Sequence, residues 1–266
     1  MQKDATGAPS MRVTPVVCTD PPYYANVGYA DLADFFYIWL RRSLNPVYPD
    51  LFATLLTPKA QELIATPYRS GGDKAKARQF FEEGLGQAFV QMRAVSHPNY
   101  PLTVFYAFKQ AEEDEDEEGV HRFPGEQDVK DERIVASTGW ETILEGLLNA
   151  GFAITGTWPM RTERGSRSVS LGTNALAFSI VLVCRRRSES ATIATRRELI
   201  TALKKELPDA LKKLQYGNIA PVDLAQAAIG PGMAVFSRFA KVLEADGTSM
   251  RVRTALAPST KCWTRC

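Results

Sequence analysis

The sequence predicts a mixed α/β fold followed by a small, mainly helical C-terminal extension. Short, β-branched apolar runs alternate with longer segments of helical periodicity between residues 13 and 187, and the composition shifts after Arg187. At 266 residues, with 45% hydrophobic side chains, the chain is long enough to bury a sizeable core. The elements come in the order strand, helix, helix, strand, helix, strand, strand. This order predicts a sheet that is covered by helices on both faces.

The N-terminal part of the chain begins with a polar segment, residues 1–12, which we expect to be a tail. The run Val13–Thr19 is short and β-branched and is followed closely by two prolines, which predicts a buried strand that leads into a loop. Asp31–Ser43 has helical spacing, and Asp31 is a residue type that caps helices. We therefore expect a well-packed helix whose apolar face consists of Leu32, Phe35, Phe36, Trp39 and Leu40.

The middle of the expected α/β domain, residues 13–187, contains a helix, a strand and a long polar insertion. Helical spacing covers Asp73–Val95, and Pro101–Lys109 then predicts a buried strand. The loop 111–136 contains the acidic run EEDEDEE. A loop of this length inside a compact domain is typically functional or disordered, so we expect it to interrupt the fold.

The last part of that domain contains one more helix and two strands. Residues 137–151 have an apolar face at helical spacing, and the helix should begin at Ser137 or Thr138 and stop at Gly151. The two further strands are expected over residues 153–160 and 175–185.

The C-terminal extension, residues 188–266, is expected to be mainly helical. Its pattern predicts a hairpin near 242–253, because Asp246-Gly247 is a turn dipeptide. Prolines and glycines should break the helical pattern at Pro208 and at Gly230-Pro231-Gly232. The expected helices are Thr195–Leu214, interrupted at Pro208, Asp223–Ile229 and Met233–Leu243.

Several classes of protein are excluded by composition. The longest apolar stretch, Ala175–Cys184, is about half of the roughly 20 residues that span a bilayer, so we expect a cytoplasmic protein without a membrane partner. The four cysteines are too widely spaced for a zinc ribbon, and the chain has only two histidines. The sequence therefore predicts neither a zinc site nor a disulfide framework.

The charge of the chain is asymmetric. The net charge is +2, but seven of the 30 acidic side chains lie in residues 112–118. The rest of the chain has 32 basic and 23 acidic residues, a net charge of +9, and can approach a polyanion such as nucleic acid. On charge alone, the alternative that lysine and arginine only solvate helix surfaces stays open.

The most specific motif is Asp20-Pro21-Pro22-Tyr23, directly after the first predicted strand. By itself this tetrapeptide could form a rigid turn. Together with the flanking runs YYANVGYADLADFFYIWLRRSL, TVFYAFKQ and STGWETILEGLLNAGF, the chain resembles the C-terminal part of bacterial adenine-specific DNA methylases with a DUF1156 domain, over about residues 16–256. The resemblance implies a partial Rossmann-like methyltransferase sheet that contains the strands after the cofactor-binding half.

The resemblance also implies a set of catalytic and base-binding residues. The exocyclic amine of a nucleobase is a poor nucleophile because its lone pair is delocalised, so acceptors must engage both N–H groups. The Asp20 carboxylate and the Pro21 carbonyl would accept them, and Pro22 would help to fix the turn. Tyr23 would stack on the flipped base, with Tyr24 and Asn26 as further base-binding candidates. Adenine N6 is the expected target, and cytosine N4 stays open.

The resemblance implies S-adenosyl-L-methionine as cofactor, but the sequence contains no matching loop. Methyltransferases of this fold bind the cofactor on a glycine-rich loop after their first strand. The nearest pattern, Phe81 to Gly86, lies inside a predicted helix and has the wrong spacing. We therefore expect the downstream part of a longer enzyme whose upstream half is a partner. The alternative is a noncatalytic DNA-binding or remnant fragment.

A second cluster is expected to contact double-stranded DNA. Arg161, Arg164 and Arg167 lie with glycine and serine between the last two predicted strands of the domain. Guanidinium groups in this setting suit phosphate contacts. A solvated hairpin loop is the alternative interpretation.

Overall fold

The computed structural model describes six segments of the chain and one single residue. It covers residues 4–7, 13–22, 24, 28–106, 138–161, 178–216 and 221–255. These residues form a mixed α/β structure, as predicted, with one sheet of four strands and one of two. No helix in these ranges is long and apolar enough to cross a membrane.

The four-stranded sheet has the order β1-β2-β4-β3, so β1 and β3 are its edges. β1 pairs in parallel with β2, and β4 is antiparallel to both of its neighbours. Pro159 lies in β3, where a missing N–H is tolerated because the strand is an edge. The strands are β1 (Cys18–Thr19), β2 (Leu102–Tyr106), β3 (Phe152–Arg161) and β4 (Phe178–Arg186).

Two of the predicted helices form as the sequence indicates. α2 (Lys74–Val95) begins after Asp73, whose side chain accepts a hydrogen bond from the backbone N–H of Lys76. α3 (Thr138–Asn149) ends just before Gly151, which has a φ of +84° that only glycine adopts without strain. Local capping residues therefore set the limits of these helices.

One face of the sheet, which we call the inner face, packs against the helices. Directly paired residues of this face, such as Val104 with Leu182 and Leu102 with Cys184, are almost fully buried. The ring of Trp140 in α3 contacts that of Tyr106 edge-on, with centroids 5.2 Å apart. Phe81, Leu85 and Phe89 of α2 join the same core.

The opposite, outer face of the described strands is only partly covered. Phe105 and Val183 are half-buried there, and Trp158 is 67% exposed. The expectation of helices on both faces is therefore wrong for the described helices. The connections from β1 to β2 and from β2 to β3 advance in the same direction across the sheet. Connections between parallel strands are right-handed as a rule, and two such connections that advance in one direction place their helices, here α2 and α3, on the same face.

The C-terminal segment contains two uninterrupted helices where we expected breaks. α4 (Arg196–Tyr216) continues through Pro208, and α5 (Pro221–Ser237) continues through Pro231. The expected helix over Met233–Leu243 is confirmed only as far as Ser237, the end of α5, and is wrong beyond it, where β6 (Lys241–Leu243) pairs in parallel with β5 (Ile193–Thr195). Buried leucines on both sides of Pro208, at positions 207 and 211, hold α4 together despite the lost hydrogen bond.

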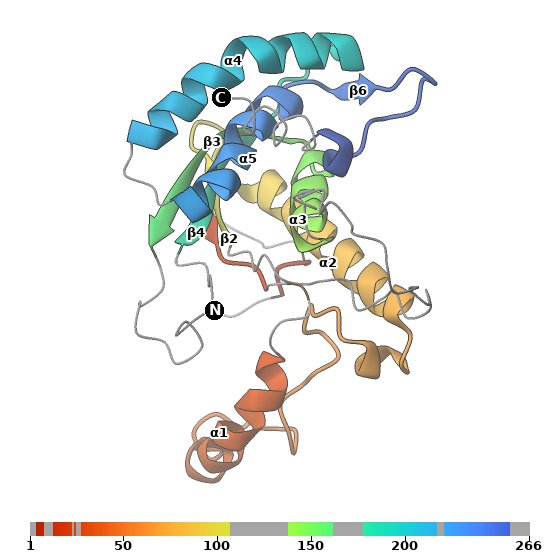
Figure 1. Cartoon of the computed structure of the whole chain (residues 1–266). Coiled ribbons are helices and arrows are strands. Elements are labelled where there is room, and N and C mark those ends of the chain that lie inside the picture. Colours follow the sequence, from red (N-terminus) through yellow and green to blue (C-terminus); the bar gives the residue numbers. More distant parts are fainter. Residues whose placement is uncertain are drawn as a thin grey trace, which may run out of the picture.

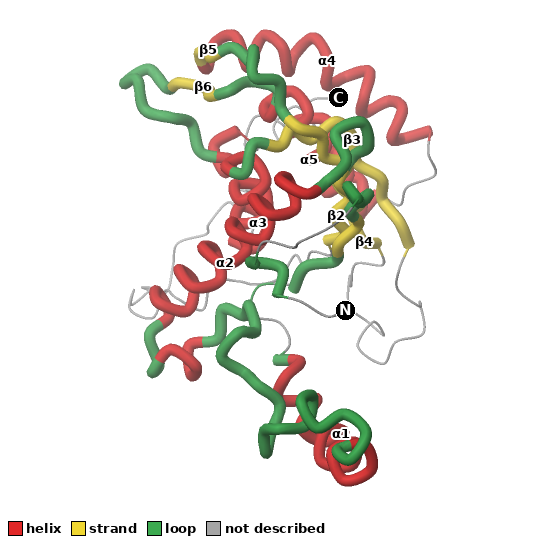
Figure 2. Tube along the Cα trace, turned by 180° about the vertical axis from the view of Figure 1, so that it is seen from behind, coloured by secondary structure: helices red, strands yellow, loops and turns green. Residues whose placement is uncertain are grey.

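This segment shares one hydrophobic core with the sheet. Leu199 and Leu203 of α4, and Met233 and Phe236 of α5, belong to the same buried cluster as the strands. Figure 2 shows α4 and α5 at the same end of the molecule as β5 and β6. The predicted turn forms at Gly247, whose φ is +82°, and Leu243 bridges to Ser249 across it.

α1 (Tyr29–Leu44) departs from the expected packing. Its N-cap is Gly28 rather than Asp31, which lies in the first turn and binds Arg69 instead. The expected apolar face points away from the chain, and Phe36 is 64% exposed. In both Figure 1 and Figure 2, α1 lies at the opposite end of the molecule from α4.

Candidate functional site

The Asp20-Pro21-Pro22 segment begins where β1 ends. The expectation of a buried strand over Val13–Thr19 is wrong in length and in burial: only Cys18 and Thr19 form ladder pairs, with Thr103 and Val104 of β2, and no residue of the run is buried. The chain before them also follows β2, because the Val17 carbonyl accepts a hydrogen bond from the Thr103 N–H at 3.1 Å. The motif therefore lies at the carboxyl end of a parallel edge strand, where ligands gather in α/β sheets.

Within the motif, exposure differs from residue to residue. Asp20 is exposed, Pro21 is buried and Pro22 is half-buried. The Pro22 carbonyl accepts a hydrogen bond from the Tyr24 N–H at 3.3 Å, and Tyr24 has a φ of 44°, which closes a tight turn. The buried proline anchors this turn, while the Asp20 carboxylate is accessible to a ligand.

Tyr24 packs into the protein. Its ring meets Phe81 edge-on, with centroids 5.3 Å apart, and its carbonyl accepts from the Ala65 N–H at 3.2 Å. These contacts give Tyr24 a role in holding the turn against α2 rather than a free ring face for a base. The other two base-binding candidates, Tyr23 and Asn26, lie outside the described residues.

The sheet brings the motif and the arginine loop to the same end. β1, β2 and β3 are mutually parallel, so Thr19, Tyr106 and Arg161 all end at this side of the sheet. Because β1 and β3 are separated by two strands, their axes lie about three strand spacings apart, roughly 14 Å, and Arg161 lies four residues beyond Thr157, the residue of β3 in line with Thr19. Arg164 and Arg167 lie outside the described residues.

An ion-pair network fixes the start of α1, a few residues after the motif. Arg69 binds Asp31 at 2.7 Å and Glu62 at 2.6 Å, and Glu62 accepts from the Ala30 N–H at 3.0 Å. Burial acts to lower the pKa of Arg69, but the hydrogen bonds to Asp31 and Glu62 raise it overall. The sequence did not predict this network, because its bonds to α1 join Asp31 to Arg69 and Ala30 to Glu62, which lie more than 30 residues apart, and no local pattern connects them.

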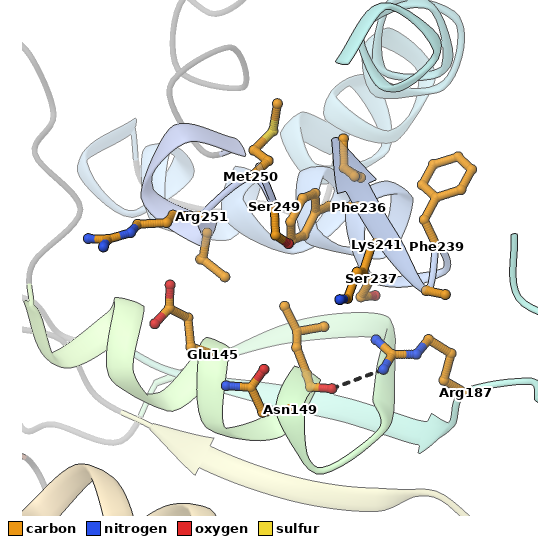
Figure 3. Close-up of a pocket in the computed structure, with 14 residues that line it drawn as sticks. Glu145, Asn149, Arg187, Phe236, Ser237, Phe239, Lys241, Ser249, Met250 and Arg251 are labelled. Carbon is orange, nitrogen blue, oxygen red and sulfur yellow. Dashed lines mark hydrogen bonds between the residues drawn. The ribbon is translucent and has the colours of Figure 1, made fainter. Parts of the chain in front are cut away.

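A cavity of about 440 Å³ lies at the other end of the sheet (Figure 3). It is lined by α3, by the end of β4 and by the C-terminal hairpin. Burial raises the pKa of Glu145 and lowers that of Arg187. Arg187 donates to the Leu148 carbonyl at 3.1 Å, so its guanidinium caps the end of α3. None of the residues of the Asp20-Pro21-Pro22 motif lines this cavity.

The described residues do not contain a loop that fits S-adenosylmethionine. Gly84 and Gly86, the nearest glycine pattern, lie within α2, where Gly84 packs against Leu63. The described ranges also hold no cluster of three or more histidine, cysteine, aspartate or glutamate side chains suited to a metal ion. Searches against protein-family models, curated proteins and solved structures found no match to this chain.

Proposed function

We propose that this chain is the target-base half of an S-adenosylmethionine-dependent DNA amino-methyltransferase of the adenine N6 class. The observation that supports this proposal best is the place of Asp20-Pro21-Pro22 at the carboxyl end of β1, with an exposed carboxylate next to a buried proline. This is the motif, and the position after a strand, on which the resemblance to the adenine-specific DNA methylases rests.

The residues of the motif would act on the amine that becomes methylated. Asp20 and the Pro21 carbonyl would accept hydrogen bonds from the two N–H groups, which favours a localised lone pair on nitrogen. Proline offers a carbonyl without a competing amide donor, so the turn presents acceptors only. Tyr23 would stack on the base after it leaves the duplex.

The methyl donor would be held by a segment other than the residues described. No glycine-rich loop follows any of the described strands. In the Rossmann-like methyltransferase sheet that the resemblance implies, the cofactor strand lies beside the motif strand. The edge of β1 that does not pair with β2 is the position at which such a strand would add.

Duplex DNA is the proposed partner at this end of the sheet. β3 ends at Arg161 on the same side of the sheet as Asp20, and Arg164 and Arg167 follow it in the sequence. Phosphate contacts from arginine position a duplex without reading its sequence. The distance of roughly three strand spacings between β1 and β3 would let this loop contact the backbone beside a flipped base.

The second candidate is a noncatalytic DNA-binding fragment. The same absence of a glycine-rich loop favours it, because a chain that cannot hold the methyl donor can still bind phosphates through its basic surface. The two candidates differ only in whether the Asp20 turn meets a cofactor.

Methyl transfer to adenine tests this proposal. The chain, alone and extended by the polypeptide encoded directly upstream, is incubated with tritiated S-adenosylmethionine and duplex DNA, and the nucleosides are identified by mass spectrometry. We expect N6-methyladenine from the extended protein and none after Asp20→Asn. N4-methylcytosine would reassign the target base. DNA binding without product or cofactor binding in either protein would support the noncatalytic fragment.

A further inference from the structure

α1 is an amphipathic helix whose apolar side faces solvent and whose polar side faces the rest of the chain. Its large apolar side chains face outward, and Leu32, Phe36 and Trp39 are 60–64% exposed. At 100° per residue, these positions lie opposite the side of the helix that carries Asp34, Tyr37 and Arg41. A helix in a globular protein normally turns its apolar stripe toward the core, so this arrangement indicates that α1 is an interaction surface.

The polar side of α1 is occupied by the chain itself. The Tyr37 hydroxyl bonds to the Thr54 carbonyl at 3.0 Å, and Arg41 Nε donates to the Phe52 carbonyl at 3.0 Å. Asp34 accepts from the Thr57 N–H at 2.8 Å and pairs with Lys59 at 2.6 Å. Because these bonds fix the rotation of the helix, α1 cannot roll its apolar side inward without losing all of them.

The exposed apolar area of α1 matches what a stable interface needs. Aromatic side chains bury about 150–250 Å² each, so the four on α1, each 60–67% exposed, leave roughly 400–600 Å² open. The exposed aliphatic side chains on the same side, Leu32 and Leu40, extend this area toward the roughly 800 Å² per partner of a standard interface. The exposed apolar residues on this side of α1 are Tyr29, Leu32, Phe35, Phe36, Trp39 and Leu40.

We propose that a second copy of this chain covers this surface, and that the two α1 helices pack antiparallel about a two-fold axis near Phe36. Asp31 and Arg42 are exposed and lie on the same flank of the helix, eleven positions apart and about equally far from its middle. A two-fold axis there brings Asp31 of each copy to Arg42 of the other. The surface is therefore complementary to itself in charge as well as in shape.

The orientation is also favoured by the helix ends. Antiparallel packing places the positive N-terminus of each α1 beside the negative C-terminus of the other. The Asp31 side chain keeps 39% of its surface exposed after pairing with Arg69, so it can accept a second cation.

The mass of the full chain in solution tests the proposal. Size-exclusion chromatography with light scattering should give twice the chain mass of 29.4 kDa for the wild type. The double variant Phe36→Asp/Trp39→Asp should run at 29.4 kDa with an unchanged circular dichroism spectrum, because both side chains point into solvent. Trp158→Asp is the matched control, since Trp158 is equally exposed but lies on the outer sheet face, and it should stay dimeric.

The flanking charge provides a second variant that does not alter the apolar surface. Arg42→Asp should raise the dissociation constant by about 2- to 30-fold, because each dimer would lose two exposed ion pairs, whereas Arg42→Lys should change it little. A monomeric wild type, a dimer that survives Phe36→Asp/Trp39→Asp, or a Trp158→Asp monomer would each overturn the proposal. None of these measurements uses DNA or cofactor, so they are independent of the proposed methyl transfer.

Discussion

Gly230 of α5 lies so close to Thr157 of β3 that a Cβ atom on Gly230 would stand 1.8 Å from the Thr157 Oγ1. The helix therefore approaches the edge strand at a distance that no larger residue permits. The same contact continues at the end of α5, where the Ser237 hydroxyl accepts a hydrogen bond from the Ile154 N–H at 2.8 Å. These two residues attach the C-terminal segment to the sheet.

Gly230→Ala should destabilise the protein by about 1–3 kcal/mol, because the added methyl group must displace Thr157 or the helix. Gly86→Ala is the matched control, since Gly86 also lies within a helix but has nothing within 4 Å of the added Cβ. It should stabilise by about 0.5–1 kcal/mol through helix propensity. Urea unfolding followed by circular dichroism measures both. Equal effects of the two substitutions would contradict the close approach.

Asp20→Ala should abolish methyl transfer in the active protein and leave its stability unchanged. The residue is exposed at the end of β1 and lies outside the hydrophobic core, so its loss should cost no core packing while it removes an acceptor for the amine. Activity is measured with tritiated S-adenosylmethionine, and the unfolding midpoint serves as the control. Transfer at the parental rate would show that the amine is not engaged by this carboxylate.

Replacing Arg161, Arg164 and Arg167 together by alanine should weaken binding to duplex DNA and reduce its salt dependence. Each phosphate contact contributes about 0.9 to the slope of log affinity against log salt concentration, so three contacts correspond to about 2.7. Fluorescence anisotropy with a labelled duplex over a range of salt concentrations gives the slope. An unchanged slope would show that these arginines make no phosphate contacts and that the segment is a solvated loop.

Acid should loosen α1 from the segment that follows it. A hydrogen bond from Tyr68 lowers the pKa of Asp31, and one from Lys59 lowers that of Asp34, both from an ordinary value of 3.8. When folding lowers the pKa of a carboxyl group, the group stabilises the folded state at any pH above its unfolded-state pKa. This contribution is lost as the pH falls through the folded-state pKa. The protection of the α1 amides from hydrogen exchange, relative to their intrinsic exchange rates at each pH, should therefore fall below pH 3.8.

Asp34→Asn is the variant that checks this assignment. The amide oxygen of asparagine can still accept from the Thr57 N–H, but the side chain no longer titrates or pairs with Lys59. We expect faster exchange in α1 at neutral pH and a smaller further change in acid. A variant with the same acid response as the wild type would assign the pH dependence to other carboxylates.

The local features of this chain follow from its sequence. The caps of α2 and α3, the turn at Gly247 and the strand before Asp20 each depend on neighbouring residues, whose φ/ψ preferences and side-chain hydrogen bonds act over a few positions. The end of the strand before the proline motif could be predicted for the same reason, because proline lacks the backbone N–H that pairing requires and therefore ends a strand whichever strand lies beside it.

The relations between distant elements were decided by tertiary structure. Periodicity gave the apolar stripe of α1 but not its direction, which is set by bonds from Asp34, Tyr37 and Arg41 to residues more than ten positions away. The continuity of α4 and α5 through prolines likewise depends on packing that offsets a lost backbone bond. The end of the sheet shared by Asp20 and Arg161 comes from the strand order, because pairing between strands joins residues far apart in the chain and leaves no periodic signal.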